Sequence, residues 1–413
     1  MTNARITLPQ ALACRECGAA YEVEPRSICD DCFGPVEPWY DLGAVDGPLF
    51  RKHAESGPPT LWRYELLLPG GPDVPRVDLG AGFTPLRRAE RLGRRLGIRD
   101  LWVKDDSVNP SNSFKDRVVS VASTMARAFG FEALSCASTG NLANAVGAHA
   151  ARAGIPAYVF VPRDLEQAKI LATEAYGAKV VAVEGNYDDV NRLCSEVAET
   201  LPWAFVNVNM RPYYAEGSKS LGFEVAEQLG WRLPDHVVVP IASGALMTKV
   251  HRAFRELVAI GAVEDRPYRI SGAQAEGCAP VARAWAEGTE DVRPVKPETI
   301  ARSLAIGNPA DGYHAIRTAK ATGGVIEACT EEEVVEGIRL LAETEGVFTE
   351  TAGGVTIAVL KRLREAGVIA PDEETVALVT GNGYKTVEAL EGTVEPTYRV
   401  PPELDAFLAA LRG

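Results

Sequence analysis

Residues 133–161, ALSCASTGNLANAVGAHAARAGIPAYVFV, decide the fold class of this chain. The apolar runs at residues 133–137 and 157–161 have the length of buried strands, and the segment at 141–152 between them has the spacing of a helix. A short polar loop joins the first run to that segment. This order predicts a right-handed βαβ unit with two parallel strands.

The same alternation extends along most of the chain. We expect irregular wrapping from Pro35 through residue 73, and regular structure only from about residue 85. The further strands are expected at residues 101–104, 179–183, 237–240, 268–273 and 375–380, and the further helices at 114–129, 165–176, 188–199 and from about 243 to 257. Strands that alternate with helices of this length indicate an α/β fold.

A lysine begins one of these helices, in residues 109–116, NPSNSFKD. The Lys115 amine could form a Schiff base with the aldehyde of pyridoxal phosphate. Ser138-Thr139-Gly140-Asn141 supplies hydroxyls, a glycine that permits close approach, and an amide able to hydrogen-bond the cofactor's ring oxygen. Taken alone, Lys115 would be interpreted as a solvated lysine paired with Asp116, so the prediction depends on the companion segments.

Three polar loops each follow a predicted strand, at residues 138–141, 242–245 and 380–383. Open parallel sheets bind ligands beyond the carboxyl ends of their strands, so we expect these loops to converge. The middle loop opens a helix, and a helix amino terminus with a close-fitting glycine suits a phosphate dianion. An ordinary strand-to-helix turn is the alternative. The predicted phosphate-loop residues are Ser243, Gly244, Ala245, Leu246, Met247 and Thr248.

Residues 113–117, SFKDR, together with 138–141, the loop at 243 and 380–383, TGNG, resemble the fold-type II pyridoxal-phosphate enzymes, and the threonine synthases most closely. The resemblance covers the chain from about residue 85 onward. It implies two parallel-sheet, three-layer domains beside an N-terminal extension. We expect the extension at 1–45, a large cofactor-binding domain at 46–120 plus 221–413, and a small α/β domain at 121–220.

The resemblance also implies roles for single residues. Lys115 would be the catalytic residue, and Thr380 would face the pyridine nitrogen with a neutral hydroxyl, which makes the ring a moderate electron sink. Phe114 and Asn141 would contact the cofactor. Ser138, Thr139 and Asn141 resemble the residues that hold the substrate carboxylate and the cofactor oxygen.

A second phosphate site is suggested by residues 211–219, RPYYAEGSK, which are similar to the family's Asn-Pro-Tyr-Arg-x-Glu-Gly-x-Lys. The arginine is displaced here, and Tyr214 stands where arginine is common. Arg211 could still clamp a phosphate bidentately, and Lys219 is a further candidate, although surface ion pairing would also explain both residues. Asn308, in a turn-forming segment, is a supporting candidate.

The activity that the resemblance implies is conversion of O-phospho-L-homoserine and water to L-threonine and phosphate, by γ-elimination followed by β-addition. Lys115 would carry the protons. A cysteate synthase that uses phosphoserine and sulfite is the alternative enzyme. A catalytically idle homologue that regulates a partner is the alternative outside enzymology.

The four cysteines Cys14, Cys17, Cys29 and Cys32 form two C-x-x-C knuckles. This spacing predicts tetrahedral thiolate coordination of a structural zinc, and the closed ligand set leaves no position for catalytic water. A nucleic-acid-binding ribbon is the alternative, but few basic residues lie nearby.

The composition limits the partners of the chain. Its 413 residues carry a net charge of −13, which argues against a nucleic-acid or anionic-membrane footprint. No stretch has the residue pattern of a secretory signal or of a membrane-spanning helix, so we expect a cytoplasmic location. The expected partner is a small phosphorylated amino acid, and the resemblance implies a homodimer.

Overall fold

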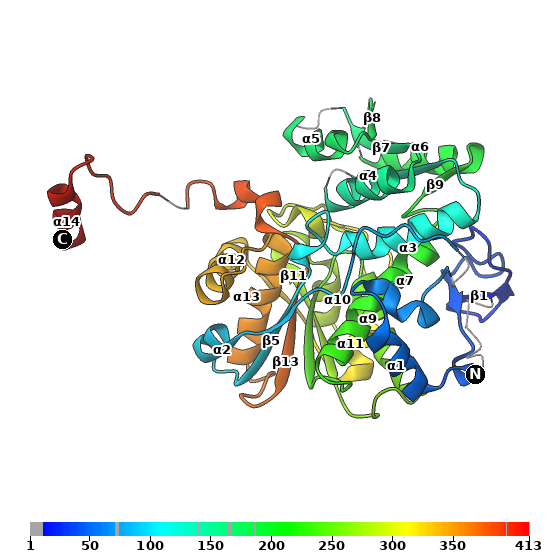
Figure 1. Ribbon diagram of the computed structural model, residues 1–413, viewed down its shortest axis with the longest axis horizontal. Coiled ribbons are helices and arrows are strands. Elements are labelled where there is room, and N and C mark those ends of the chain that lie inside the picture. Colours follow the sequence, from blue (N-terminus) through cyan, green and yellow to red (C-terminus); the bar gives the residue numbers. More distant parts are fainter. Residues whose placement is uncertain are drawn as a thin grey trace.

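The computed structural model describes residues 11–70, 74–138, 140–163, 167–185, 187–393 and 395–412 (Figure 1). Two open sheets and a small N-terminal sheet organise the chain. Among the described residues, no helix has the length and apolar character needed to cross a bilayer.

The larger sheet has six strands in the order β12-β11-β10-β13-β5-β4. Its neighbours pair in parallel except β4, which is antiparallel to β5. The strands are β4 Leu86–Arg88, β5 Asp100–Asp105, β10 His236–Pro240, β11 Arg269–Ala275, β12 Ile326–Cys329 and β13 Glu374–Val379.

Helices cover both faces of this sheet, because its strands carry apolar side chains in both directions. Val237 and Val239 belong to one buried cluster with Phe254 of α9, whereas Val238 belongs to another with Val355 of α13. Full burial of both faces is the rule for parallel sheets. The helices of this layer system are α2 Glu90–Leu96, α8 Lys219–Gln228, α9 Ala245–Ala259, α10 Pro280–Ala286, α11 Gly312–Thr322, α12 Glu331–Glu345 and α13 Thr351–Glu365.

The smaller sheet has four parallel strands in the order β8-β7-β6-β9. One face packs with Val146 of α4, and the other packs with Val190 and Cys194 of α6. This sheet falls within the predicted small domain, whose exact boundaries stay a prediction. Its elements are β6 Ala133–Ala137, α4 Asn141–Ala153, β7 Ala157–Pro162, α5 Gln167–Ala175, β8 Lys179–Val183, α6 Tyr187–Thr200 and β9 Trp203–Phe205.

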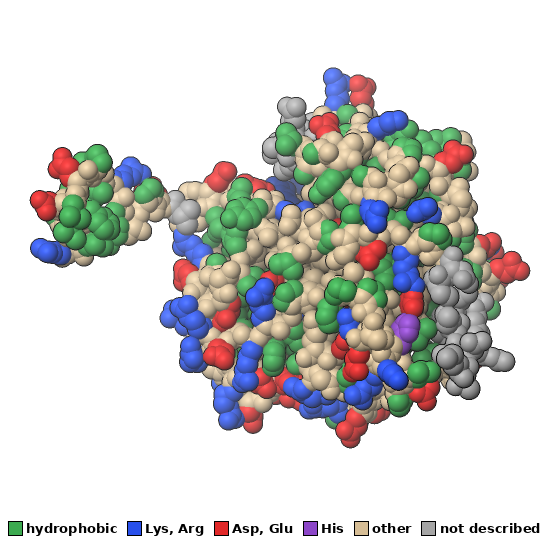
Figure 2. All heavy atoms as spheres, viewed as in Figure 1, with side chains coloured by type: hydrophobic (Ala, Val, Ile, Leu, Met, Phe, Trp, Pro, Cys, Tyr) green, Lys and Arg blue, Asp and Glu red, His purple; other side chains and the backbone are tan. Residues whose placement is uncertain are grey.

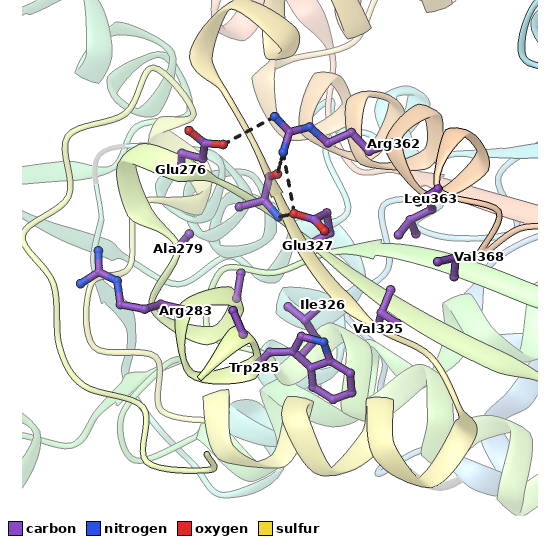
Figure 3. Close-up of a pocket in the computed structure, with 14 residues that line it drawn as sticks. Glu276, Ala279, Arg283, Trp285, Val325, Ile326, Glu327, Arg362, Leu363 and Val368 are labelled. Atoms are coloured by element: carbon purple, nitrogen blue, oxygen red, sulfur yellow. Dashed lines mark hydrogen bonds and ion pairs between the residues drawn. The ribbon is translucent and has the colours of Figure 1, made fainter. Parts of the chain in front are cut away.

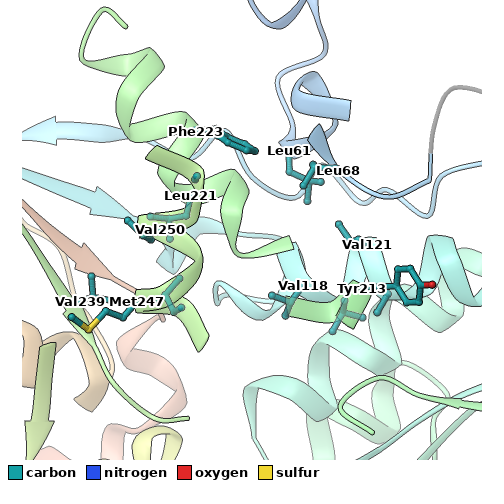
Figure 4. Packing of buried hydrophobic residues seen from close by; sticks show 14 of the residues in the cluster. Leu61, Leu68, Val118, Val121, Tyr213, Leu221, Phe223, Val239, Met247 and Val250 are labelled. Carbon is teal, nitrogen blue, oxygen red and sulfur yellow. The ribbon is translucent and has the colours of Figure 1, made fainter. Parts of the chain in front are cut away.

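Two helices, α3 Lys115–Ala128 and α7 Arg211–Gly217, lie between the two sheets (Figure 1). Their buried side chains join a core that reaches both sheets. Figure 4 shows Val118 and Val121 of α3 and Tyr213 of α7 in this core, with Phe223 of α8 in the same cluster. Because the catalytic lysine is predicted at the first turn of α3, this packing fixes it between the two sheets.

The prediction that regular structure begins near residue 85 was wrong. Helix α1 Gly47–Ser56 and the 3-10 helix η2 Leu61–Leu67 precede that point. Trp62 and Tyr64 of η2 are fully buried, so hydrophobic burial orders a segment in which proline and glycine obscured the pattern. The other 3-10 helices are η1 Leu42–Ala44, η3 Asp106–Val108, η4 Glu276–Cys278, η5 Arg302–Leu304, η6 Gly383–Lys385 and η7 Val387–Leu390.

The two ends of the chain differ in packing. At the N-terminal side, β1 Ala11–Cys14, β2 Ala20–Tyr21 and β3 Val36–Trp39 form an antiparallel sheet in the order β2-β1-β3, placed against the body. At the C-terminal side, α14 Leu404–Arg412 projects from the body, and its apolar side chains are exposed (Figure 2).

Candidate functional site

Lys115 begins α3 at the carboxyl edge of the larger sheet. The Phe114 amide donates to the Thr380 carbonyl at 2.9 Å, and Ser113 forms a β-bridge with Gly381. Strand β13 ends one residue before Thr380. The predicted lysine segment and the predicted TGNG loop therefore lie side by side.

Arg117, two residues after the lysine, anchors the start of α3. Its guanidinium is fully buried, with Nε 2.6 Å from Asp106 Oδ2 and Nη2 2.7 Å from Glu224 Oε2. Lys104 Nζ is 2.6 Å from the same Glu224 carboxylate. Burial alone would raise the pKa of Glu224, but Arg117 and Lys104 lower it to about 2. Every charge in this cluster is paired, and the cluster joins α3 to β5, η3 and α8.

The Lys115 amine faces helix α7. Its Nζ lies 2.9 Å from the Tyr214 hydroxyl and 4.7 Å from the centre of the Phe114 ring. Arg211 precedes Tyr214 by three positions, so it lies on the same helix face, one turn away. The structure thus brings together Lys115, Phe114 and Tyr214, and it places Arg211 one helical turn from Tyr214.

Asn141 begins α4 and reaches across to the larger domain. Its Nδ2 donates to both carboxylate oxygens of Glu350, at 3.0 and 2.9 Å. Burial raises the pKa of Glu350, against the opposing effect of this amide and of the nearby Lys385 charge. Glu350 was not among the predicted site residues. Its position directly before helix α13 gave no distinguishing signal in the sequence.

The loop at residues 243–248 has the form of an anion site. Gly244 has a φ of 96°, and a Cβ there would lie 2.5 Å from the Asp311 carbonyl oxygen, so only glycine fits. Helix α9 begins at Ala245, without a side-chain cap and without an acidic residue in its first turn. The amides of Leu246 and Met247 have no hydrogen-bond partner among the described residues and can bind a phosphate, whereas the Ala245 amide also faces Ser243 Oγ.

The side chains of this loop have different surroundings. Ser243 is half-buried, and its Oγ lies 3.4 Å from the Ala245 amide. Thr248 donates its hydroxyl hydrogen to the Ala245 carbonyl at 2.9 Å, so only its oxygen lone pairs remain for a ligand. The side chains of Leu246 and Met247 belong to the hydrophobic core, and Figure 4 shows Met247 beside Val239. These two residues can contribute backbone amides only.

The structure corrects one predicted substrate residue. Lys219 is fully buried, and its Nζ lies 2.7 Å from Glu216 and 2.8 Å from Glu256. A lysine whose charge is neutralised by two buried carboxylates has no free donor charge for a substrate phosphate. The local sequence suggested a site because Lys219 follows Tyr214 closely, but it lies on the next helix and faces the core.

The remaining predicted substrate residues have varied positions. Arg211 pairs with Asp311, Nη2 to Oδ2, at 2.9 Å. Ser138 is half-buried at the end of β6, and Asn308 is exposed. Thr139 lies outside the described residues. Asp311 was missed as a site residue, although it lies in the segment from which Asn308 was chosen.

The four cysteines of the N-terminal sheet converge. Their Sγ atoms all lie within 4.8 Å of one another. A Cβ at Gly34 would lie 3.2 Å from the Sγ atoms of both Cys14 and Cys32, so glycine keeps the space beside the thiols open. Four convergent thiols and no other ligand type suit a tetrahedral thiophilic ion such as zinc.

A cavity of about 470 Å³ lies elsewhere, at the β12 edge of the larger sheet (Figure 3). Trp285, Ile326 and Leu363 line it, and Arg362 crosses it to the Ala328 carbonyl at 2.6 Å. None of the predicted site residues borders it. The chemistry of the lysine site therefore has to be argued from its own side chains.

Those side chains fit pyridoxal phosphate. Lys115 presents an amine. Thr380 is 5% exposed, and its hydroxyl makes no hydrogen bond within the described part of the chain. The Gly244 turn offers helix amides to a phosphate. One covalent anchor, one ring partner and one phosphate site are the groups that this cofactor requires.

Comparison with known proteins agrees with this geometry. Residues 77–381 match the family model described as pyridoxal-phosphate dependent enzyme. The chain is 35% identical over 402 residues to the threonine synthase of Methanocaldococcus jannaschii, covering 97% of this chain and 98% of that protein. It is 34% identical over 409 residues to the threonine synthase of Methanosarcina acetivorans, with 97% and 98% coverage.

Solved structures show the same fold at lower identity. Diaminopropionate ammonia lyase from Escherichia coli superposes with a TM-score of 0.65 at 19% identity, covering 84% of this chain and 94% of that one. The processed form of threonine deaminase isoform 2 from Solanum lycopersicum gives 0.61 at 24% identity, with 75% and 84% coverage. The chain therefore belongs to the pyridoxal-phosphate-dependent enzymes of fold type II, and it is a lyase related to the threonine synthases.

Proposed function

We propose that this enzyme converts O-phospho-L-homoserine and water to L-threonine and inorganic phosphate. The observation that carries the proposal is the face of α7, where Arg211 lies one turn from Tyr214, whose hydroxyl is 2.9 Å from Lys115 Nζ. Arg211, one helical turn from the tyrosine that contacts the reacting amine, is our candidate for binding a second phosphate, in addition to the cofactor phosphate that we assign to the loop at Gly244. The two relatives described above are threonine synthases, which supports L-threonine as the product.

Bound pyridoxal phosphate would supply an electron sink for bonds to the α carbon of the amino acid. Lys115 then acts as the proton carrier. It removes protons at the α and β carbons, returns one to the γ carbon after phosphate has left, and returns the other to the α carbon after water has added its oxygen at the β carbon. The Tyr214 hydroxyl holds the Lys115 amine in one orientation and can exchange a proton with it. Arg211 binds the phosphate that leaves from the γ carbon.

Asn141 and Thr380 would hold the ring from two sides. We assign the Asn141 amide to the cofactor's ring oxygen, and the Thr380 hydroxyl to the pyridine nitrogen. Glu350 receives the Asn141 amide in this structure. Because its carboxylate is buried and its pKa is raised, Glu350 can take up a proton when the cofactor's oxygen competes for the same amide.

We further propose that the four cysteines bind one structural zinc. The chain is proposed to act as a homodimer in the cytoplasm on small substrates, without nucleic acid. These assignments are tested by metal analysis, by the mass of the particle in solution and by fractionation.

The test of the reaction uses purified protein with O-phospho-L-homoserine, with separate detection of phosphate and L-threonine. Lys115→Ala should abolish both products. Lys179→Ala is a matched control, because Lys179 also contacts a tyrosine hydroxyl, at 3.1 Å, but in an exposed position in the small domain. Phosphoserine with sulfite is run in parallel. Cysteate formation without threonine would move the assignment to the alternative synthase, and no product from either substrate would favour an idle homologue.

A further inference from the structure

A single carboxylate joins the N-terminal extension to the proposed substrate arginine. Asp311 Oδ2 lies 2.9 Å from Arg211 Nη2, and Asp311 Oδ1 lies 3.6 Å from Arg15 Nη1. Arg15 is the residue after Cys14, within the first cysteine knuckle. The Asp311 side chain is 10% exposed, and those of Arg15 and Arg211 are 24% and 34% exposed. Two arginines from distant parts of the chain thus share one largely buried acid.

The backbone of Asp311 is fixed to the phosphate loop. Its amide donates to the Ser243 carbonyl at 2.8 Å, and its own carbonyl fills the space where Gly244 lacks a Cβ. Asp311 therefore cannot move away from the site without disturbing that loop. Its negative charge stays close to any anion that Arg211 binds.

This arrangement poses an electrostatic problem for a phosphorylated substrate. When Arg211 turns from Asp311 to a phosphate, the carboxylate loses its nearer cation while a dianion arrives beside it. The Asp311 carboxylate and the phosphate are both negative, and two negative charges that lie close together repel strongly in a partly desolvated site. Arg15 is the cation that remains on Asp311.

The second acid that pairs with Arg15 is Glu37, and it does not depend on the Arg15 charge. Arg15 also lies 3.6 Å from Glu37. However, Glu37 has two further cations, Lys249 at 2.9 Å and Arg252 at 2.6 Å. Glu37 is thus neutralised without Arg15, whereas Asp311 pairs only with Arg15 and Arg211 among the described residues.

We propose that Arg15 is a positioning residue for recognition of the substrate phosphate. It neutralises Asp311 when Arg211 transfers to the phosphate, so the cysteine-bearing extension contributes directly to the preference for phosphorylated substrates. This inference rests on the proposed function in one respect, which is that Arg211 binds the substrate phosphate.

The test measures phosphate binding in the holoenzyme, independently of turnover, by calorimetric titration with inorganic phosphate. Arg15→Gln should raise the dissociation constant about fivefold, the size expected for a partly exposed charge pair. Asp311→Asn should lower it, because the amide keeps the shape and removes the repulsion. The double variant Arg15→Gln/Asp311→Asn should return close to the wild-type value.

The control is Arg26→Gln in the same extension. Arg26 pairs with Glu24 and Asp30, each at 2.6 Å, and does not contact Asp311. It should leave phosphate binding unchanged. Metal content is measured in all variants, so that disruption of the cysteine cluster is distinguished from loss of the Arg15 charge.

Kinetics provide the second measurement. With O-phospho-L-homoserine, Arg15→Gln should raise KM about fivefold and leave kcat within about twofold, because only binding of the phosphate is weakened. Opposite shifts for the two single variants, with recovery in the double variant, would establish the proposal. An unchanged phosphate affinity in Arg15→Gln, or a double variant as weak as Arg15→Gln, would overturn it. Failure of the wild type to form threonine would instead refute the proposed reaction, while the phosphate titrations would still decide the role of Arg15.

Discussion

The phosphate loop makes a sharp prediction at Gly244. In Gly244→Ala, the new Cβ would lie 2.5 Å from the Asp311 carbonyl oxygen and 2.7 Å from its carbonyl carbon. Neither atom can rotate away, because both belong to the backbone at the start of α11. The start of α9 or the start of α11 has to shift, and the phosphate amides shift with it.

The expected effect of Gly244→Ala on stability and on cofactor affinity follows from two separate free-energy costs. A non-glycine residue in the left-handed region costs about 1–2 kcal/mol. Overpacking against a rigid neighbour adds about 1–3 kcal/mol. The second cost falls on the cofactor site itself, and since about 1.4 kcal/mol corresponds to a factor of ten, we expect cofactor affinity to fall by about tenfold or more.

Gly154→Ala separates the two costs. Gly154 ends α4 with a φ of 70°, and nothing lies within 4 Å of the position that a Cβ would take there. Both variants are unfolded in denaturant, and both apoenzymes are titrated with pyridoxal phosphate at the visible band of the lysine-bound cofactor. Gly154→Ala should lose about 1 kcal/mol of unfolding free energy with unchanged affinity. Equal cofactor affinities for the two variants would refute the phosphate assignment of this loop.

Four further predictions concern single residues. Tyr214→Phe removes the hydrogen bond to Lys115 but keeps the ring, so steady-state assays should show kcat reduced about tenfold with a smaller change in KM. Burial lowers the pKa of His149 to about 4 from 6.5, so the neutral form stabilises the fold above pH 6.5 and this contribution is lost as pH falls toward 4. His149→Gln lacks this titrating group. The drop in unfolding free energy between pH 6.5 and pH 4, measured from denaturation curves at these two pH values, should therefore be smaller by up to about 3 kcal/mol than in the wild type. Cys29→Ser should abolish the bound metal in elemental analysis and lower the melting temperature, and retention of a full metal equivalent would contradict the zinc proposal. Lys219→Met should cost about 3 kcal/mol of stability, because it leaves buried carboxylates short of a cation, with KM unchanged in the folded fraction.

Most strands of the two open sheets were predictable from their own residues, whereas the short strands β4, β9 and β12 were not predicted. Residues 133–137 and 179–183 were predicted as strands, and β6 and β8 have these bounds. The predicted strand at 237–240 lies within β10 His236–Pro240. Parallel strands buried on both faces need continuous apolar runs, and such runs stand out between amphipathic helices. The ligand loops could then be located from the positions at which the strands end.

The 46–85 region and the ion pairs could not be predicted in the same way. Trp62 and Tyr64 are buried by partners far along the chain, such as Ser120 and Glu227, to which they donate hydrogen bonds. Lys219 was assigned to the substrate for a similar reason, since a motif gives the spacing of a residue but not the direction of its side chain. Partners far apart in the sequence leave no periodic signal.

The N-terminal extension shows why such distant contacts matter for function. Interpreted alone, its cysteines predict a metal staple that only stabilises the first forty residues. In the structure, Glu37 of β3 pairs with Lys249 and Arg252 on α9, the helix whose amino terminus forms the proposed phosphate site. Arg15 pairs with Asp311, which adjoins the same terminus. The extension is therefore attached both to the helix and to the loop that form the proposed anion site, so it can influence anion binding. Loss of its metal should weaken phosphate binding as well as lower the melting temperature.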